Sequence, residues 1–550
     1  MHWKTLSNLS RFKDIAVVLF RYGFDDLLQR LDLPGSTVVE MLGKVDLSLT
    51  TAERIRLALE ELGPTFVKLG QIMSLRPDLL PSELIEELSK LQDEVPPVPF
   101  EAVRSVLEES LQQPIDTVFS VLDPDPLAAA SLAQVHRAVL LREGTIVSVK
   151  VQRPGIRRKL TMDLDILAVI ADRLHEQSED LQIYDLPRLV QVTRRNLMRE
   201  VDFRLEARNI RIARSLMDED DGLCIPNVYD AYGSERVLVT DFIQGTKLRN
   251  LRTRKLADPE ALAKIGLRAA VKQILEDGFF HADPHPGNMI VTEDERLCLI
   301  DWGLIGRLTE KDRFDLVDVL SAIVAKNSEA LLASLLRISK PMGAVAHRSL
   351  ERDLLDVVDS YYAVPLRELN VGSLLMDIST LLREYHLQLP PDFVIMIKAL
   401  ITAEGSARQI YPDLNVISEA EGSVARLAAR RYKPGYLWAR IKNTVSQLAL
   451  LQRELPGRIG RIADQIERGE LNIHFRHENL GDLINSLENT ASRVTLGIII
   501  GAMIIGSSMI ITTGAGPQLF GFPALGIIGY FISAVFGLWL VYNILRSKRF

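Results

Sequence analysis

The chain has 550 residues, of which 47% are hydrophobic and 25% charged, and its formal net charge is −7. This length predicts two or more packed units, and the mild acidity gives no support for nucleic-acid binding, which calls for a basic domain or stripe. The only two cysteines, Cys224 and Cys298, are too few for a disulfide framework or a cysteine-built zinc site, which favours a reducing compartment.

Residues 1–50 are predicted to form a helical segment that either lies on a membrane surface or is an ordinary surface helix. Apolar positions recur among basic ones at helical spacing from Phe12 to Leu28. The apolar run from Ile15 to Phe20 is short and is followed directly by Arg21, without a small-residue cleavage site. A signal peptide is therefore not expected here.

Residues 51–120 are predicted to form a helical extension. Breaks are expected at Gly63-Pro64 and at Arg76-Pro77, and the proline-rich stretch 95–99 is interpreted as a linker or turn. A short helix is expected to resume over 102–111.

The region 121–245 contains the strongest strand signals. Two β-branched runs, 135–141 and 145–151, flank Arg142-Glu143-Gly144 and predict a hairpin. A second strand pair is predicted near 227–231 and 236–240, with helices from 158 to about 217. Because helical patterns dominate from about 255 onward, the sequence predicts an α+β fold with a strand-bearing lobe over 121–245 and a helical lobe over 246–490.

The region 491–550 is predicted to contain two transmembrane helices. From Val494 to Leu545 there is no Asp, Glu, Lys or Arg, and this span is about twice the roughly 20 residues that one crossing needs. Helices over about 494–513 and 523–545 are expected, joined by a turn at 514–517 and 522–523. The flanking basic residues favour the cytoplasm for both ends; they are Arg493, Arg546, Lys548 and Arg549. A buried helical pair of a soluble protein is the alternative.

Small residues recur at a spacing of four within this region. The pairs are Gly497 with Gly501, Ala502 with Gly506, and Ser533 with Gly537. Such pairs let helix backbones approach closely in lipid. We expect them to pack the hairpin against itself; dimerisation or contact with a lipid-like substrate is the alternative.

Three segments stand in an order that is typical of nucleotide chemistry. A strand ends in Lys150, Asp283 and Asn288 lie five apart on one loop, and Asp301 precedes Trp302-Gly303 after a strand-like run. Phosphoryl transfer is mostly positioning and charge neutralisation. A strand lysine can contact phosphates, and oxygen ligands suit Mg²⁺. Lysine, D-x-x-x-x-N and a D-F-G-like triplet in this order form the kinase pattern.

Each segment has a less specific interpretation on its own. Lys150 is also compatible with a solvated strand edge. Glu200, Asp202 and Glu206 are compatible with an exposed helix face. His281, Asp283 and His285 alternate in a way that suits a transition-metal site. Asn288 five residues after Asp283, and Asp301 eighteen after it (301 minus 283), favour nucleotide and Mg²⁺ instead.

Three further motifs make the resemblance specific. Lys68-Leu69-Gly70-Gln71 matches the K-x-G-Q signature of the UbiB/AarF family of atypical kinase-like ATPases. Ala128, Ala129, Ala130 and Ser131 resemble its alanine-rich loop, and Glu200-Val201-Asp202 resembles its E-x-D motif. The resemblance implies a bilobal protein-kinase-like fold with a helical N-terminal extension, a large helical C-lobe and a C-terminal transmembrane hairpin.

The resemblance also implies roles on the small-lobe side. Lys150 would bind the nucleotide phosphates and Glu206, on the same helical stretch as Glu200 and Asp202, would pair with it. Glu200 and Asp202 would instead face Lys68 or a metal.

Asp283 would be the catalytic-loop aspartate, Asn288 the second metal ligand and Asp301 the principal Mg²⁺ ligand. The segment Asp241-Phe242-Ile243 would be the hinge whose backbone binds adenine, with Asp241 and Ile243 at its two ends. The alanine loop would cover the phosphates of ATP more stiffly than glycines do.

The implied function is ATP hydrolysis, or phosphorylation of a small or lipid-like molecule, in support of ubiquinone or another isoprenoid-quinone pathway. ATP and Mg²⁺ are the expected cofactors. Expected partners are a membrane lipid or isoprenoid-quinone precursor, proteins of a biosynthetic complex and a second copy of the chain, but no nucleic acid. An inner or cytoplasmic membrane location, with the soluble bulk in the cytoplasm, is expected. A nucleotide-binding scaffold and a protein kinase acting in trans are the alternatives.

Overall fold

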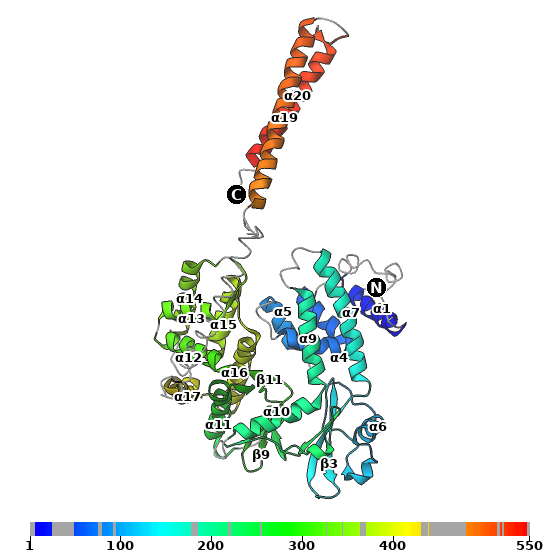
Figure 1. Cartoon of the computed structure of the whole chain (residues 1–550), viewed down its shortest axis with the longest axis vertical. Helices are drawn as coiled ribbons and strands as arrows, with labels where there is room; N and C mark the ends of the chain where they lie inside the picture. The colour runs from blue at the N-terminus through cyan, green and yellow to red at the C-terminus, as the bar shows by residue number, and fades with distance from the viewer. Residues whose placement is uncertain are drawn as a thin grey trace, which may run out of the picture. The chain divides into compact units, whose positions relative to one another are not determined.

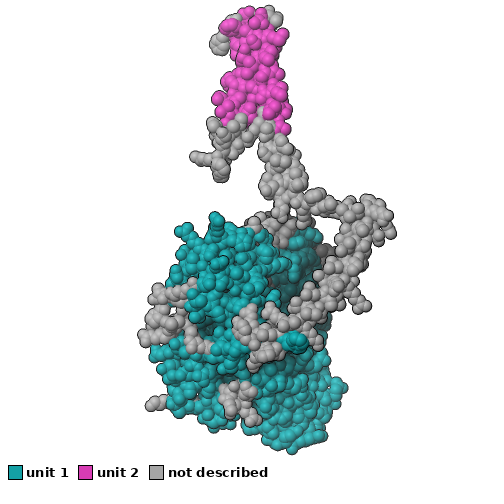
Figure 2. Space-filling model, turned by 60° about the vertical axis from the view of Figure 1, so that its left-hand side comes forward, with its two compact units in different colours: residues 1–439 teal, residues 440–550 magenta. Residues whose placement is uncertain are grey.

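The computed structural model describes residues 6–24, 49–74, 80–91, 95–177, 185–217, 222–253, 256–325, 327–343, 345–362, 370–430, 438, 480–513, 517–519 and 522–546. They form two compact units, residues 1–439 and 440–550 (Figures 1 and 2).

The N-terminal helices pack against one another through apolar faces. They are α1 (Leu6–Arg21), α3 (Thr51–Leu62), α4 (Pro64–Ser74) and α5 (Ser82–Ser89). Phe12, Ile15 and Val18 of α1 are buried in a cluster that includes Leu62 and Phe66. The apolar face of α1 is thus occupied by protein within the described residues. The predicted break at Gly63-Pro64 is confirmed, with Gly63 at φ +94°, whereas Arg76-Pro77 and Leu28 lie outside the described residues.

The small lobe is an antiparallel sheet with a helix on one face. Its strands are β1 (Phe119–Leu122), β2 (Ala128–Ala129), β3 (Ala133–Leu140), β4 (Ile146–Gln152) and β6 (Val237–Asp241), in the order β1-β3-β4-β6 with β2 beside β3. The predicted hairpin between β3 and β4 is confirmed. Val147, Val149 and Val151 are buried in a cluster with residues of α6 (Phe100–Leu111), so period-two alternation turns Lys150 toward the opposite face.

Three helices follow the hairpin: α7 (Ile156–Gln177), α9 (Leu186–Glu200) and α10 (Phe203–Leu216). α7 and α9 lie side by side (Figure 1). The prediction that Glu200, Asp202 and Glu206 share one helical stretch is wrong, because the chain breaks between α9 and α10. Asp202 is the N-cap of α10, where its carboxylate accepts a hydrogen bond from the Arg204 backbone N–H at 3.2 Å. An aspartate at this position favours a helix start.

The second predicted strand pair is only half correct. β6 forms, but residues 227–231 contribute a single bridge, from Val228 to Thr240, and then a 3-10 turn at Asp230–Tyr232. The Asp241 carboxylate binds the backbone and side-chain N–H groups of Asn227 at 2.9 and 2.7 Å. Such local side-chain bonds compete with a continuous strand ladder.

The large lobe combines short strands with a helical body. Its mixed sheet has the order β5-β10-β9-β7, and β8 pairs with β11. The strands are β5 (Leu223–Cys224), β7 (Gly245–Lys247), β8 (Phe279–His281), β9 (Met289–Thr292), β10 (Leu297–Leu299) and β11 (Ile305–Arg307). Cys224 and Cys298 lie opposite each other in β5 and β10, both as free thiols.

The helical body of the large lobe shares one extensive apolar core. A π-helical turn (Gln273–Asp277) links α11 to β8, and a small ladder joins β12 (Lys340–Pro341) to β13 (Leu387–Gln388). The helices are α11 (Pro259–Lys272), α12 (Glu310–Val324), α13 (Ser328–Ile338), α14 (His347–Tyr362), α15 (Val371–Glu384), α16 (Pro391–Ile410) and α17 (Val416–Arg430).

The second unit is a helical hairpin of α19 (Leu480–Thr513) and α20 (Ala524–Arg546). Val494–Thr512 and Ala524–Val541 are long and apolar enough to cross a membrane, by length and composition only, and just 6% and 11% of these windows are buried. α19 begins before the predicted residue 494 because its helix continues through the polar residues that precede the apolar window. Residues 514–516 of the predicted turn lie outside the described residues.

The glycines of the predicted close-packing pairs do not hold this hairpin together. A Cβ added at Gly497, Gly501, Gly506 or Gly537 would meet no described atom within 4 Å. The close approach lies instead at Gly526 and Gly529, where an added Cβ would come within 3.1 Å of the Ser507 carbonyl and 2.1 Å of its hydroxyl, respectively. Spacing alone did not identify which face of each helix meets the other.

Candidate functional site

Lys150 lies in a charged cluster at the junction of the two lobes. Its ammonium donates to both carboxylate oxygens of Glu206 in α10, at 2.9 and 2.8 Å, and lies 3.6 Å from Asp301 Oδ2. Glu206 is 5% exposed to solvent, whereas the Asp301 side chain is 44% exposed. The strand lysine, the helix glutamate and the aspartate after β10 are therefore brought together.

The charges in this cluster control one another. Burial alone would lower the pKa of Lys150, but Asp301 and Glu206 outweigh it and raise that pKa. Burial would raise the pKa of Asp301, yet Lys150 and the Gly303 backbone N–H hold it well below its usual range. Burial raises the pKa of Glu206 to about 7, although Lys150 opposes the shift. Lys150 is thus shared between two carboxylates, of which the closer one, Glu206, is made harder to ionise by its burial.

The segment Asp301-Trp302-Gly303 is held in place by its own backbone and by α10. The Asp301 carboxylate accepts from the Gly303 N–H at 3.0 Å, and Asn209 of α10 donates to the Trp302 carbonyl at 3.0 Å. Trp302 is fully buried, and its ring centroid lies 5.1 Å from that of His281. Trp302 is thus the aromatic packing group next to Asp301.

The loop between β8 and β9 brings Asp283 and Asn288 to the same region. The Asp283 N–H donates to His281 Nδ1 at 3.1 Å, and the Asn288 amide donates to the Asp283 carbonyl at 3.3 Å. The Ile300 N–H donates to the Asn288 carbonyl at 3.1 Å, which ties the loop to the residue before Asp301. The loop is consequently anchored at both of its motif residues.

The transition-metal interpretation of His281, Asp283 and His285 has no support in the geometry. Among the described residues, no group of three or more His, Cys, Asp or Glu side chains could hold a metal ion. His281 and His285 each use Nδ1 to accept a backbone N–H, from Asp283 and Gly287. Asn288 and Asp301 offer amide and carboxylate oxygens instead, and oxygen donors of this kind suit Mg²⁺.

The K-x-G-Q helix α4 reaches the site through Lys68. The Lys68 ammonium lies 2.8 Å from Glu200 Oε1, at the end of α9, and its charge contributes to the low pKa of Asp301. The other two motif residues fix the helix: Gln71 donates to the Leu91 carbonyl at 3.1 Å, and a Cβ at Gly70 would lie 2.3 Å from Leu91 Cδ1.

Asp202 departs from its expected role. Its carboxylate binds the Arg204 guanidinium at 2.8 and 2.7 Å and caps α10, so it does not face Lys68. Only the Glu200 member of the E-x-D motif pairs with Lys68 in this structure.

The alanine loop is a hydrogen-bonded hairpin. Ala128 and Ala129 pair with β3, the Ala130 N–H donates to the Ala133 carbonyl at 2.8 Å, and Arg153 donates to the Ala130 carbonyl at 2.7 Å. Ser131 is 99% buried, and its hydroxyl has no hydrogen-bond partner within the described part of the chain. The turn is therefore stiffened by backbone bonds as well as by methyl groups.

The expected hinge begins at the last residue of β6, Asp241. The Asp241 carboxylate is occupied by Asn227 and by the Tyr229 hydroxyl, at 2.8 Å, and the Phe242 N–H donates to the Ile146 carbonyl at 3.3 Å. Asp241 is therefore engaged in structural contacts. Ile243 is half-buried at the end of the segment.

Sequence reasoning missed Lys398 of α16. Its ammonium lies 3.9 Å from Asp283 Oδ1, and burial lowers its pKa although Asp283 opposes the shift. A signal was present, because Lys398 is the one charged residue in the otherwise apolar run from Phe393 to Ile401. Ser406 of the same helix donates to the Pro284 carbonyl at 3.0 Å, so α16 supports the loop at two points.

Three family models match the chain. They are the ABC1 atypical kinase-like domain over residues 90–335, the UbiB helical domain over 354–415 and the ABC1/UbiB kinase-like C-terminal domain over 478–546. The first match confirms the kinase-like part of the predicted fold. Lys398 lies within the second.

Curated relatives match along nearly their full length. A protein of Clostridium pasteurianum, named as uncharacterized in the hydrogenase 1 5'region, is 32% identical over 98% of this chain and 99% of its own. The probable protein kinase UbiB of Xanthomonas campestris pv. campestris (strain B100) is 31% identical, and the match covers 90% of this chain and 91% of that protein. The solved Rv3197–erythromycin complex from Mycobacterium tuberculosis is 23% identical, with a TM-score of 0.45, over 64% of this chain and 90% of that chain.

Proposed function

The chain belongs to the UbiB family of atypical kinase-like proteins, and from this premise we propose that it is a membrane-anchored, Mg²⁺-dependent ATPase. The observation that carries the proposal is the contact of Lys150 with both Glu206 and Asp301, at 2.8 and 3.6 Å. A phosphate-binding site of the kinase type needs a strand lysine held by a helix carboxylate, close to an aspartate that binds the metal.

Each residue of the cluster has a distinct task in this proposal. Lys150 stays protonated and contacts the phosphates, while Glu206 orients it from α10. Asp301 and Asn288 would hold Mg²⁺, which when bound neutralises phosphate charge and polarises the transferred group. Asp283 orients the attacking water or hydroxyl group and receives its proton.

The lysines around the site favour water or a small acceptor over a protein substrate. Lys68 from α4 and Lys398 from α16 lie beside Glu200 and Asp283, respectively. Residues of the N-terminal extension also contact the large lobe, since Arg383 at the end of α15 donates to the Leu80 carbonyl. A folded protein substrate would have to displace these helices, whereas water or a phenolic head group would not.

The membrane part of the proposal rests on the hairpin of α19 and α20. Its two apolar windows are 19 and 18 residues long, which matches the hydrocarbon thickness that one helix covers. Arg493 precedes the first apolar window and Arg546 follows the second. We propose that the soluble unit faces the cytoplasm, because basic residues favour that side. Support of a ubiquinone or related isoprenoid-quinone pathway is the proposed role, because curated relatives carry the UbiB name.

The direct test is phosphate release from ATP by the full chain in detergent or lipid nanodiscs, with and without Mg²⁺. We expect Mg²⁺-dependent turnover that a phenolic quinone precursor analogue stimulates. ATP binding without turnover under every condition would favour the scaffold alternative. Label transfer from ATP to a co-purified protein, but not to water or lipid, would favour a protein kinase.

A further inference from the structure

The small lobe carries a polar pocket whose lining residues are separate from the Lys150 cluster. Its volume is about 460 Å³, and its lining includes four arginines and one glutamate, a net charge of +3 (four minus one). Neither Lys150, Glu206 nor Asp301 lines it. The charged residues come from the position after β4, the first turn of α7 and the two positions before β6; they are Arg153, Arg157, Arg158, Glu235 and Arg236.

The arginines of this pocket differ in how firmly they are held. Arg153 donates to the Ala130 and Pro96 carbonyls at 2.7 Å each, so it is part of the framework. Arg157 pairs with Glu235 at 3.0 Å, but their side chains are 62% and 40% exposed. An exposed ion pair of this kind contributes little to stability and can be displaced by a competing anion. The Arg158 side chain is exposed and has no hydrogen bond or ion pair to the residues that the structure describes.

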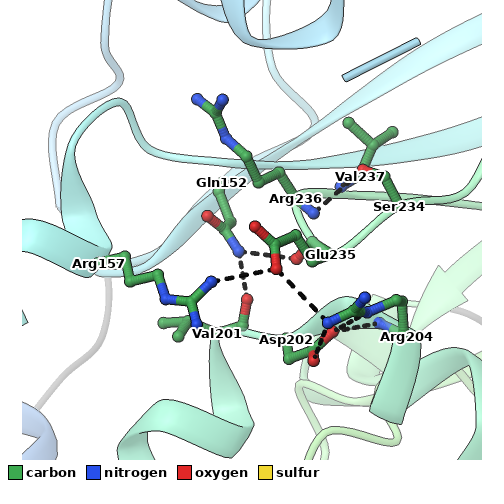
Figure 3. Close-up of polar contacts among 9 residues, drawn as sticks. All are labelled: Gln152, Arg157, Val201, Asp202, Arg204, Ser234, Glu235, Arg236 and Val237. Carbon is green, nitrogen blue, oxygen red and sulfur yellow. Dashed lines mark hydrogen bonds and ion pairs between the residues drawn. The ribbon is translucent and has the colours of Figure 1, made fainter. Parts of the chain in front are cut away.

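The carboxylate of Glu235 is itself an anion bound by two guanidinium groups of this region. Arg157 and Arg204 approach its carboxylate from opposite sides, at 3.0 and 3.4 Å (Figure 3). The Glu235 carboxylate thus already occupies a bridging position between two guanidinium groups. A stronger anion can compete for Arg157 and also recruit Arg158, which no carboxylate of the described chain neutralises.

The net charge of the whole chain is −7, so the positive charge of this pocket is a local feature. Guanidinium forks match phosphate oxygens in geometry and bind them with charge-assisted hydrogen bonds. The pocket is large enough for a phosphate ester or a pyrophosphate group, and too limited for the extended basic stripe that nucleic acid needs.

We infer that this pocket is a binding site for a small phosphate-bearing anion, with Arg157 and Arg158 as its main ligands. The anion can be a free phosphate compound or the phosphodiester head group of an anionic lipid, since both present the same oxygens. The inference does not depend on the proposed ATPase activity, because it concerns binding at residues outside the Lys150 cluster.

The pocket is physically connected to the motif helices. Gln152, which lines it, donates through its amide to the Val201 carbonyl and, at 2.8 Å, to the Glu235 carbonyl (Figure 3). Val201 is the junction between α9 and α10, which carry Glu200 and Glu206. An anion that draws Arg157 away from Glu235 therefore acts on the segment that positions both glutamates.

The test is isothermal titration calorimetry of the full chain in phosphatidylcholine nanodiscs, free of nucleotide and Mg²⁺. The probes are inorganic pyrophosphate, glycerophosphoglycerol as the soluble head group of an anionic lipid, and glycerophosphocholine as the zwitterionic control. A Lys150→Gln background removes phosphate binding at the proposed ATP site. We expect one site for pyrophosphate or glycerophosphoglycerol that Arg158→Gln and Arg157→Gln each weaken by about tenfold.

The matched control is Arg142→Gln, which removes an equal charge from the exposed tip of the β3–β4 hairpin. It should leave the affinity unchanged, and equal thermal midpoints for all variants would show that folding is preserved. Preference for pyrophosphate would identify a free phosphate compound, and preference for glycerophosphoglycerol a lipid head group. Binding of both anions that is equally strong in the Arg157 and Arg158 variants, or no binding of either, would overturn the inference.

Discussion

The Lys398 ammonium lies 3.9 Å from Asp283 Oδ1, although 115 positions (398 minus 283) separate the two residues in the chain. The contact joins α16, within the segment that matches the UbiB helical domain, to the loop of the kinase-like domain. A positive charge next to the carboxylate that would receive a proton both orients that carboxylate and attracts phosphate. Lys398 is therefore a positioning residue for the proposed chemistry.

Replacing Lys398 tests this positioning role through the pH profile of ATP turnover. Burial lowers the pKa of Lys398, so the lysine should lose its charge, and the enzyme its activity, at a lower pH than an ordinary lysine would allow. Lys398→Arg should keep activity to higher pH because the guanidinium stays charged. Lys398→Met should lower turnover about tenfold across the range. Identical profiles for all three proteins would leave Lys398 with a purely structural role.

Asp301→Asn should abolish Mg²⁺-dependent turnover while the fold is retained. The amide keeps an acceptor for the Gly303 N–H, and Lys150 keeps its bonds to Glu206. The loss should exceed about a hundredfold, because a metal ligand contributes several kcal/mol to the transition state. Phosphate release at varied Mg²⁺ is the measurement, with Asp294→Asn on an exposed turn as control. Full activity of the Asp301 variant would remove the assigned metal role.

Glu206 makes a pH-dependent contribution to stability in the absence of nucleotide and Mg²⁺. Because burial raises the pKa of Glu206 to about 7 from its unfolded value of 4.5, the folded state holds this proton more tightly. The contribution is thus present in full below pH 4.5 and is lost as pH rises through about 7. Its largest size is about 3 kcal/mol.

The measurement is the difference in unfolding free energy between the natural protein and Glu206→Gln, from pH 5 to 9. The difference should fall with rising pH and level off above about pH 8, since glutamine does not titrate. Lys150 and Asp301 do not titrate between pH 5 and 9, and groups remote from Glu206 contribute equally to both proteins and cancel. A difference that does not fall between pH 5 and 9 would mean that Lys150 keeps Glu206 ionised.

Ala129→Gly should change the ratio of the affinities for ATP and ADP. Ala129 lies in β2, where its carbonyl accepts the Val95 N–H at 3.4 Å, and glycine at this place loosens the turn. Nucleotide titrations at fixed Mg²⁺ give the two dissociation constants, and Ala231→Gly, in an exposed 3-10 turn, is the control. An unchanged ratio would mean that the alanine loop does not cover the phosphates.

Local patterns in the sequence predicted the centre of the site well. The short apolar strand that ends in Lys150, together with the order of Asp283, Asn288 and Asp301, predicted that these residues meet, and Lys150 lies 3.6 Å from Asp301. These features depend on a few neighbouring residues, so the sequence contains the information that determines them. The strands β5 and β7–β11 are two to four residues long, which is too short for a periodic signal.

The contacts of Asp202 and Lys398 were not predicted, because each side chain has several possible partners and the fold decides which one it meets. Asp202 was expected to face Lys68 or a metal, but the helix start and Arg204 are adjacent to it in the chain, whereas Lys68 comes from α4. Lys398 was missed because nothing near it in the chain points to Asp283. Motifs identify residue types, whereas tertiary packing decides which partner each side chain meets.

Gly70→Ala in the K-x-G-Q helix α4 should lower the stability of the protein by disturbing the packing of this helix. Gly70 faces the end of α5 so closely that an added Cβ would lie 2.3 Å from Leu91 Cδ1 and 3.0 Å from Leu59 Cδ1. Gly70→Ala must therefore push α4 away from its neighbours, at a cost of about 1–3 kcal/mol. Because Lys68 lies on the same helix and pairs with Glu200, ATP turnover should change together with stability.

Gly405→Ala in α16 is the matched control for Gly70→Ala. Nothing lies within 4 Å of a Cβ added there, so the change should stabilise the helix by about 0.5–1 kcal/mol through the lower backbone entropy of the unfolded chain. Thermal unfolding and limited proteolysis of residues 51–91 measure both effects. If Gly70→Ala were as stable as the natural protein and equally resistant to protease, α4 would not be docked against Leu91. The Lys68–Glu200 contact would then lose its structural basis, because the position of Lys68 depends on that docking.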